Sequence, residues 1–290
     1  MVVEKEPNRS KKRKSLKQLR LLDDSLFTKC LDDNVAAMEL ILGIILDDPS
    51  IKVSEVRTQK YIEEIQNRSV RLDIFAKNTE NGTAYDVEIQ RTNAGASPRR
   101  ARHNSAALDK ELIEKGESVQ NLPDSYVIFL TEKDIYGHGL AVYHVRRYIE
   151  ELSVPFNDGA EIIYVNGSYS DESDIGKLMH DFRTSDPDRM YFKVLAESIR
   201  YFKENPKGVS EMCQVMDEFF NDGRTLGHKE GREEGLEEGR KEGREEGRKE
   251  GIEEGISLTA KRLLDAKLLS LDEISKITGL SYDKLMLLES

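Results

Sequence analysis

Three side chains that can bind a metal ion or orient its water lie in two neighbouring runs of strand-like sequence. The runs are RLDIFAKN (71–78) and AYDVEIQ (84–90), and they carry Asp73, Glu88 and Gln90. Two carboxylates held close together repel each other unless a cation joins them. Their hard oxygen atoms suit Mg²⁺ or Mn²⁺. Such an ion polarises a phosphoryl oxygen and activates a water molecule, which Gln90 would orient.

A tight turn is needed to bring these side chains together. Asn81-Gly82 favours a two-residue type I′ turn, and that turn would place Asp73 opposite Gln90. Directly opposed residues share a face of the sheet, so this register predicts that the three polar side chains converge on one face. Leu72 and Ile74 then lie on the other face. The alternative from periodicity alone is an ordinary hairpin whose polar face is solvated.

A helix is predicted before the hairpin. Apolar residues recur at helical spacing from Val35 to Ile45, and Asp33 or Asn34 can cap this helix. Glu39 lies within the apolar helix, so its carboxylate is either on the open face or held near a site.

A second helix and further strands follow the hairpin. Ser97 and Pro98 fit the cap and the first position of a helix that ends at Gly116. The nearly continuous apolar run 125–132 suits a buried central strand, and 140–148 and 161–167 predict two more. Helical sequence follows from about residue 173. This order predicts a mixed α/β sheet with helices on its faces.

The two ends of the chain differ in composition from its middle. Residues 1–20 are basic, which indicates a flexible tail or a supporting phosphate contact. Residues 21–222 form the predicted core domain. Glycine recurs at every fourth position within residues 223–256, which predicts a solvated linker or a helix made firm by a partner helix. Residues 257–290 predict a small helical element for capping or dimerisation, with a weaker likeness to a helix-turn-helix.

Composition and charge restrict the class of protein. The formal net charge of -11 argues against a protein that coats nucleic acid in general. No apolar run reaches the roughly 18 residues that span a bilayer, so no membrane partner is expected. Cys30 and Cys213 belong to no close Cys/His cluster, which favours free thiols in a cytoplasmic protein over a zinc site or a disulfide framework.

An ordered set of motifs resembles the PD-(D/E)XK nuclease family transposases, relatives of the recombination-promoting nucleases. The resemblance covers roughly residues 18–256, including a similar Gly/Glu/Arg tail. It implies a restriction-endonuclease-like mixed sheet core flanked by helices, with a helical C-terminal extension. The matching sequences are LLDDSLF, VRLDIFA, YDVEIQRTN, PRRARHNSAALDKELIEKGE, SYVIFLTEKDIYGHGL and VYHV.

The resemblance also implies roles for individual residues. Asp73 and Glu88 would be ligands of Mg²⁺, with Mn²⁺ as a substitute, and Gln90 would occupy the position of the superfamily lysine. Glu39 would match an acid that completes the metal site. Four arginines would line the DNA path and contact phosphates, namely Arg91, Arg99, Arg100 and Arg102.

Two features depart from the family pattern. Gln90 lacks the positive charge of lysine and therefore stabilises a charged phosphate less well. His103 and Asn104 stand where the family more often has aromatic residues after the arginine, which puts an aromatic contact at this point in doubt.

These observations support two functions of different classes. The first is a Mg²⁺-dependent DNA endonuclease that hydrolyses phosphodiester bonds in recombination or transposition. The alternative is a catalytically inactive DNA-binding or self-assembly protein, with the C-terminal segment as a surface for homo-oligomers. The intact set of Asp73, Glu88 and Gln90 favours the endonuclease.

Overall fold

The computed structural model describes residues 15–63, 69–92, 95–113 and 116–289. The chain divides into two compact units, Met1–Phe219 and Phe220–Ser290. Of the predicted basic tail, only residues 15–20 lie within the described part of the chain.

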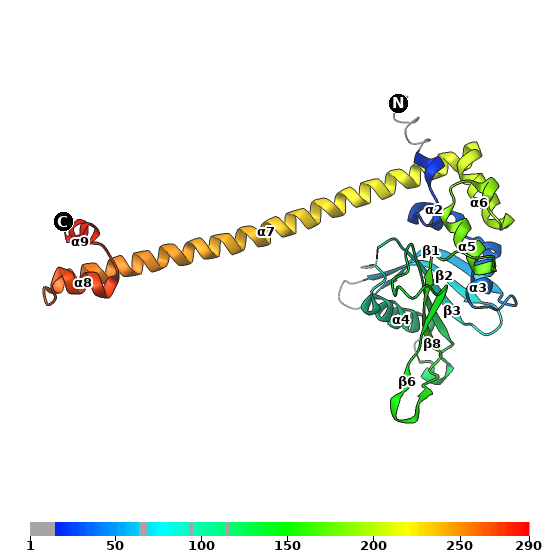
Figure 1. Cartoon of the computed structure of the whole chain (residues 1–290), viewed down its shortest axis with the longest axis horizontal. Coiled ribbons are helices and arrows are strands. Elements are labelled where there is room, and N and C mark those ends of the chain that lie inside the picture. The colour runs from blue at the N-terminus through cyan, green and yellow to red at the C-terminus, as the bar shows by residue number, and fades with distance from the viewer. Residues whose placement is uncertain (1–14, 64–68, 93–94, 114–115, 290) are drawn as a thin grey trace. The chain divides into compact units, whose positions relative to one another are not determined.

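A six-stranded mixed sheet forms the centre of the first unit (Figure 1). Its strand order is β1-β2-β3-β4-β8-β5. β4 runs parallel to both of its neighbours, β3 and β8, and the remaining pairs are antiparallel. The predicted mixed sheet is confirmed, and the apolar run 125–132 does provide a central strand. The bounds are β1 Val53–Glu63, β2 Ser69–Asn78, β3 Ala84–Gln90, β4 Ser125–Thr131, β5 Val142–Val145 and β8 Ala160–Asn166.

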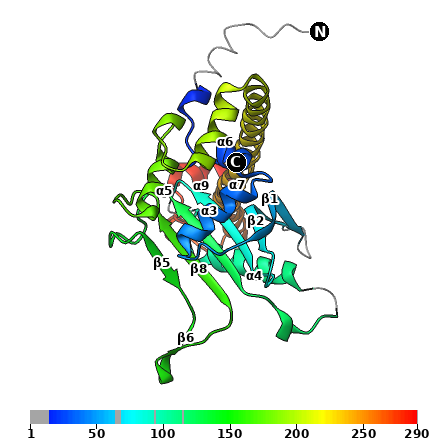
Figure 2. The same ribbon diagram turned by 90° about the vertical axis from the view of Figure 1, so that its right-hand side faces the viewer.

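A separate two-stranded ribbon pairs β6 (Tyr148–Ile149) with β7 (Val154–Pro155). Figure 2 shows β5 beside β8 and the β6 end of the ribbon projecting away from the main sheet. Within the described residues, single turns of 3-10 helix lie at Val119–Asn121, Glu150–Leu152 and Pro187–Arg189.

Helices cover both faces of the sheet. α4 (Pro98–Leu112) packs on one face, against apolar residues such as Phe75 and Phe129. Several helices pack on the opposite face around a larger apolar core, and Figure 1 shows α3 and α5 across the sheet from α4. They include α2 Asp24–Leu31, α3 Val35–Ile45, α5 Asp174–Arg183, α6 Lys193–Glu204 and the first turns of α7, which begins at Pro206.

Side-chain caps define where α3 and α4 begin. Asn34 caps α3, because its side-chain oxygen accepts the Ala37 N–H over 3.1 Å. Ser97 caps α4 by accepting the Arg100 N–H over 3.4 Å, and Pro98 occupies the first turn as predicted.

The β2–β3 connection differs from the predicted two-residue turn. Lys77 pairs with Ala84, and the Asn78 N–H donates to the Thr83 carbonyl over 2.8 Å. Four residues therefore form the loop, and only Gly82 among them has positive φ, at 75°. A type I′ turn needs two such residues, so the prediction was wrong.

This loop shifts the hairpin register by two residues. Ile74 pairs with Val87, which brings Asp73 toward Glu88 rather than opposite Gln90. Because side chains alternate with a period of two, an even shift keeps the acidic residues of β3 on the face that was expected.

The prediction that Leu72 and Ile74 lie on the same face of the sheet was wrong. Leu72 packs in the core beneath α4 and Ile74 in the core on the opposite face. The β1–β2 ladder has no pair at Gln59 and Asp73, and Gln59 adopts a left-handed φ of 51°. Leu72 and Ile74 lie on opposite faces because the ladder is interrupted between them. A prediction from strict alternation of side chains cannot include such an interruption.

α7 (Pro206–Ala266) is one unbroken helix that includes the whole glycine repeat (Figure 1). α8 (Leu271–Thr278) and α9 (Tyr282–Glu289) pack with its last turns around four buried side chains. A capping box of Ser270 and Glu273 starts α8, and Gly279 ends it with φ of 73°. The four buried residues are Ala260, Leu264, Ile274 and Leu285.

Two expectations from composition concern the whole chain. Within the described residues, none of the helices is both long and apolar enough to cross a membrane. Cys30 is buried and Cys213 is half-buried, and both are free thiols.

Candidate active site

Asp73 and Glu88 make contact just beyond the last ladder pair of β2 and β3, which joins Ile74 to Val87. The Asp73 N–H donates to Glu88 Oε1 over 3.1 Å. In return, the Ile89 N–H donates to Asp73 Oδ2 over 3.3 Å. Each carboxylate is therefore held by the main chain of the opposite strand, and the two acids are fixed beside each other.

The surroundings of these acids disfavour two negative charges. Glu88 is 0% exposed and Asp73 is 6% exposed. Burial raises the pKa of Asp73 to about 8, and the charges of Glu88 and Asp24 act in the same direction, against Arg71 and Arg100. Burial also raises the pKa of Glu88, while Arg100 and the donated hydrogen bonds lower it. A proton therefore stays on the pair near neutral pH unless a metal cation takes its place.

The Gln90 amide lies beside the same pair. Its Nε2 donates to Glu88 Oε2 over 3.3 Å. Its Oε1 fills the space next to Gly95, where an added Cβ would lie only 1.8 Å from that oxygen. Because Gly95 has no side chain, there is space for the Gln90 amide to turn its nitrogen toward Glu88.

Arg100 from α4 contacts the acid pair as well. Its Nη2 lies 3.1 Å from Glu88 Oε2, and its side chain is 43% exposed. One helical turn later, Asn104 Nδ2 donates to Asp86 Oδ2 over 3.1 Å. Two polar contacts thus join one face of α4 to alternate residues of β3.

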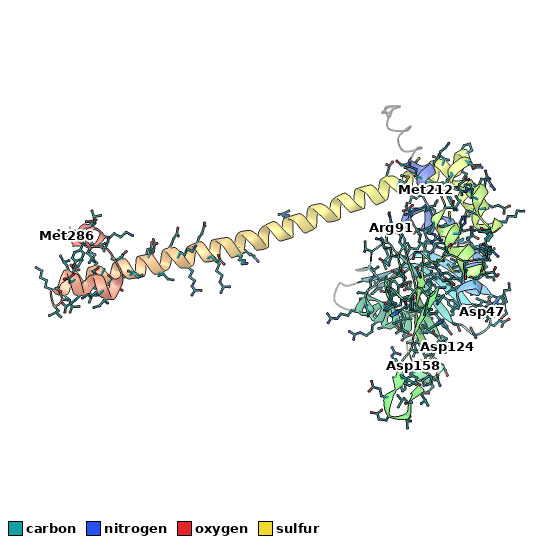
Figure 3. The ribbon with its side chains drawn as sticks, in the orientation of Figure 1. Asp47, Arg91, Asp124, Asp158, Met212 and Met286 are labelled. Atoms are coloured by element: carbon teal, nitrogen blue, oxygen red, sulfur yellow. The ribbon has the colours of Figure 1, made fainter. Side chains whose placement is uncertain are left out.

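The other three arginines of the predicted DNA path lie elsewhere. Arg91 (Figure 3) is paired with Asp23 Oδ1 at 3.1 Å and Glu132 Oε2 at 3.2 Å. Arg99 and Arg102 are exposed on α4. Among the contacts of the described residues, only Arg100 of these four reaches the acid pair.

A comparison with protein families assigns the chain to a family. The model described as PD-(D/E)XK nuclease family transposase matches residues 26–173, just over half of the 290-residue chain. The chain belongs to this family. Membership supports a nuclease or transposase type of function, and the observed sheet with helices on both faces is consistent with the restriction-endonuclease-like fold.

The match to the PD-(D/E)XK nuclease family transposases includes the whole acid pair, Gln90 and Arg100. It begins two residues after Asp24, which lies outside it. Searches of curated proteins and of solved structures found no match.

PD-(D/E)XK nucleases generally use divalent metals, and the acid pair fits such an ion. Among the described residues, no group of three or more His, Cys, Asp or Glu side chains is placed to hold a metal. Mg²⁺ usually needs only one or two carboxylates, because water and substrate phosphates supply its other ligands. Two buried carboxylates that repel each other, with an amide beside them, suit that requirement.

Glu39 is not brought to the acid pair. Its carboxylate binds Lys52 Nζ at 3.0 Å and accepts the Val53 N–H over 3.1 Å, which ties α3 to the start of β1. Asp24, the first residue of α2, instead lies close enough to raise the pKa of Asp73 by its charge. From the sequence alone, helix capping is the favoured role of Asp23 and Asp24, and a role at a metal is the weaker alternative.

Sequence reasoning missed the contact of Asp86 with Asn104. Both side chains are buried, and one oxygen of Asp86 has no hydrogen-bond partner. Burial and the charge of Glu88 raise the pKa of Asp86 well above its ordinary value. Two spacings in the sequence could have predicted this contact, namely Asp-x-Glu on the strand and Arg-x-x-x-Asn on the helix. When α4 packs on β3, the arginine meets the glutamate and the asparagine meets the aspartate.

Substitution of Gly95 tests the position of the Gln90 amide. Gly95→Ala places a methyl group where Gln90 Oε1 now lies, so the amide must turn away from Glu88. On the nuclease type of function that family membership supports, we expect DNA cleavage to fall about tenfold, since displacement of a group beside the acid pair by about 1 Å is costly. Cleavage rates of Gly95→Ala and Gln90→Ala measured side by side give the check, and normal cleavage by Gly95→Ala would contradict the assigned position.

Proposed function

We propose that this protein is a divalent-metal-dependent DNA endonuclease that hydrolyses phosphodiester bonds, with Mg²⁺ as the metal and Mn²⁺ as a substitute. The observation that carries the proposal is the buried contact between Asp73 and Glu88, with Gln90 on the same carboxylate. Its assignment to recombination or transposition rests on the family description.

Each side chain has a defined part in the proposed reaction. Asp73 and Glu88 hold the cation, which when bound polarises the phosphate and lowers the pKa of a water molecule. The Gln90 amide orients the attacking water. Asp24, in place of Glu39, adds negative charge next to Asp73 and strengthens the attraction for the cation. The basic side chains of α4 contact the phosphates of bound DNA.

Cleavage of supercoiled plasmid tests the proposed function. We expect nicking only in the presence of Mg²⁺ or Mn²⁺, and its loss on addition of EDTA. Nicking that persists in EDTA would contradict a metal-dependent hydrolysis. Binding of the plasmid with no cleavage under any metal would instead support the alternative of a non-catalytic DNA-binding protein.

We also propose that α7 self-associates as a parallel pair of helices. Five glycines of the repeat lie within the described side chains, and a Cβ at any of them would meet nothing within 4 Å. Each glycine costs roughly 1 kcal/mol of helix stability relative to alanine, so a continuous helix here needs a packing partner. The five are Gly239, Gly243, Gly247, Gly251 and Gly255.

The charges beside the glycines favour a second copy in parallel. Arg240, Arg244 and Arg248 follow glycines directly and lie on one flank of the stripe. Glu246 and Glu250 precede glycines and lie on the other flank. All five are exposed. With the glycine stripes face to face, a parallel pair sets the basic flank of one helix beside the acidic flank of its partner, whereas an antiparallel pair sets like charges together.

Light scattering after size-exclusion chromatography tests this pairing on the full chain. We expect a particle of twice 33.1 kDa. The triple change Gly243→Gln, Gly247→Gln and Gly251→Gln raises helix propensity but blocks close approach, so it should yield monomers.

Substitutions on the opposite side of the same helix provide the control. Lys241→Gln, Glu245→Gln and Lys249→Gln lie away from the stripe and should leave the dimer intact. A monomeric wild-type protein, or a dimer that survives the glycine changes, would contradict the proposed pairing.

A further inference from the structure

Arg100 holds the face of Glu88 that a metal ion requires. Glu88 Oε1 accepts the Asp73 N–H, and Glu88 Oε2 faces both Arg100 Nη2 at 3.1 Å and Gln90 Nε2 at 3.3 Å. A cation that binds Oε2 must displace at least one of these donors. The guanidinium is the charged donor, and like charges repel, so it is the group that has to leave.

The structure allows the Arg100 side chain to move while its backbone stays in place. Ser97 caps the helix start three residues before Arg100, and Asn104 is fixed to Asp86 one turn after it. Asn104 and Asp86 are only 3% and 0% exposed, whereas the Arg100 side chain is 43% exposed. The long side chain can therefore swing from the buried carboxylate toward solvent without any change in α4.

The site needs a positive charge that Gln90 does not provide. A phosphodiester at the acid pair brings negative charge, and an arginine fork binds phosphate oxygens with two parallel hydrogen bonds. Arg91 is already held by Asp23 and Glu132. Arg100 is the arginine of α4 whose guanidinium binds Glu88 Oε2.

We propose that Arg100 exchanges between two partners during the reaction cycle. Without metal it neutralises Glu88, and when a divalent cation takes Glu88 it moves to a phosphate oxygen of the bound DNA. This inference rests on the proposed endonuclease function and adds to it a coupling between the two ligands. DNA relieves the competition for Glu88, so metal and DNA each strengthen the binding of the other.

Mn²⁺ binding, followed by the electron paramagnetic resonance signal of free Mn²⁺, tests the exchange in the full-length protein. Without DNA, Arg100→Ala should bind Mn²⁺ about tenfold more tightly than wild type, because the competing cation is gone. The same variant should cleave plasmid about 100-fold more slowly, because the phosphate loses its charged partner. Arg100→Lys should lie between wild type and Arg100→Ala in both measurements.

The opposite signs of these two effects separate the exchange from other roles. A purely structural arginine would weaken metal binding and cleavage together, and a simple phosphate contact would leave Mn²⁺ affinity unchanged. Arg99→Ala removes a neighbouring charge from the same helix and should keep the Mn²⁺ affinity of wild type. Melting temperatures of all variants show whether they fold. If Arg100→Ala does not fold, Arg100→Gln provides a second uncharged substitution with a longer side chain.

Two results would overturn different statements. Equal or weaker Mn²⁺ affinity of Arg100→Ala and Arg100→Gln, in an enzyme whose wild type binds Mn²⁺ through Asp73 and Glu88, would overturn the exchange alone. Wild-type Mn²⁺ binding that is unchanged by Asp73→Ala and Glu88→Ala would overturn the proposed metal site and the endonuclease with it.

Discussion

Replacement of either acid of the pair, by Asp73→Ala or Glu88→Ala, is expected to reduce plasmid cleavage by about 1,000-fold or more. The two carboxylates are the protein ligands that we assign to the cation, and loss of one removes several kcal/mol of transition-state stabilisation. Each factor of ten in rate corresponds to about 1.4 kcal/mol. Gel assays of supercoiled, nicked and linear plasmid at saturating Mg²⁺ and Mn²⁺ measure the loss.

Glu80→Ala is a matched control for these variants. Glu80 lies in the loop of the same hairpin and is exposed, so its loss removes a carboxylate without touching the acid pair. We expect this variant to cleave at the wild-type rate. Equal nicking by the wild type and both acid variants would show that the activity comes from a contaminant and would remove the catalytic assignment.

The second large effect concerns stability without metal. Burial raises the folded-state pKa of Asp73 from 3.8 to about 8. Between these two values the folded protein binds more protons than the unfolded chain, so its free energy of unfolding falls as pH rises. The contribution of this group is complete below pH 3.8 and is lost as pH rises to about 8. Each unit of pKa difference corresponds to about 1.4 kcal/mol, so the loss is on the order of a few kcal/mol.

Asp73→Asn should remove much of this dependence. An asparagine oxygen can still accept the Ile89 N–H, but the side chain carries no charge to repel Glu88. In urea denaturation at pH 6 to 9 with EDTA, we expect the wild type to lose stability and the variant to lose less. At pH 8 the variant should be the more stable protein.

Mg²⁺ should reverse the order of the two proteins. A ligand that binds only the folded state stabilises it, so Mg²⁺ is expected to raise the stability of the wild type at pH 8 and to leave Asp73→Asn unchanged. Glu80→Gln should follow the wild type with and without metal. Identical pH slopes for wild type and Asp73→Asn would contradict the raised pKa of Asp73.

Local chemistry determined much of this protein from its sequence. The caps at Asn34 and Ser97, the proline in the first turn of α4 and the apolar run of β4 each act over a few residues. Those signals predicted the helix starts and the central strand, because capping and burial of a continuous apolar segment need no distant partner. The alternation of β3 also placed Glu88 and Gln90 on one face.

The tertiary structure alone decided how the site is completed. The loop of residues 79–82 sets the register of the hairpin, and the break in the ladder at Gln59 sets which side chains around Asp73 lie on each face. The turn propensity of Asn81-Gly82 predicted neither. Glu39 and Asp24 are both acids on helices beside the sheet, yet Glu39 binds Lys52, while Asp24 lies close enough to Asp73 for its charge to raise the pKa of Asp73. Of four nearby arginines, Arg100 reaches Glu88. These choices depend on how helices pack on a sheet, and packing joins residues far apart in the chain, whereas sequence signals act locally.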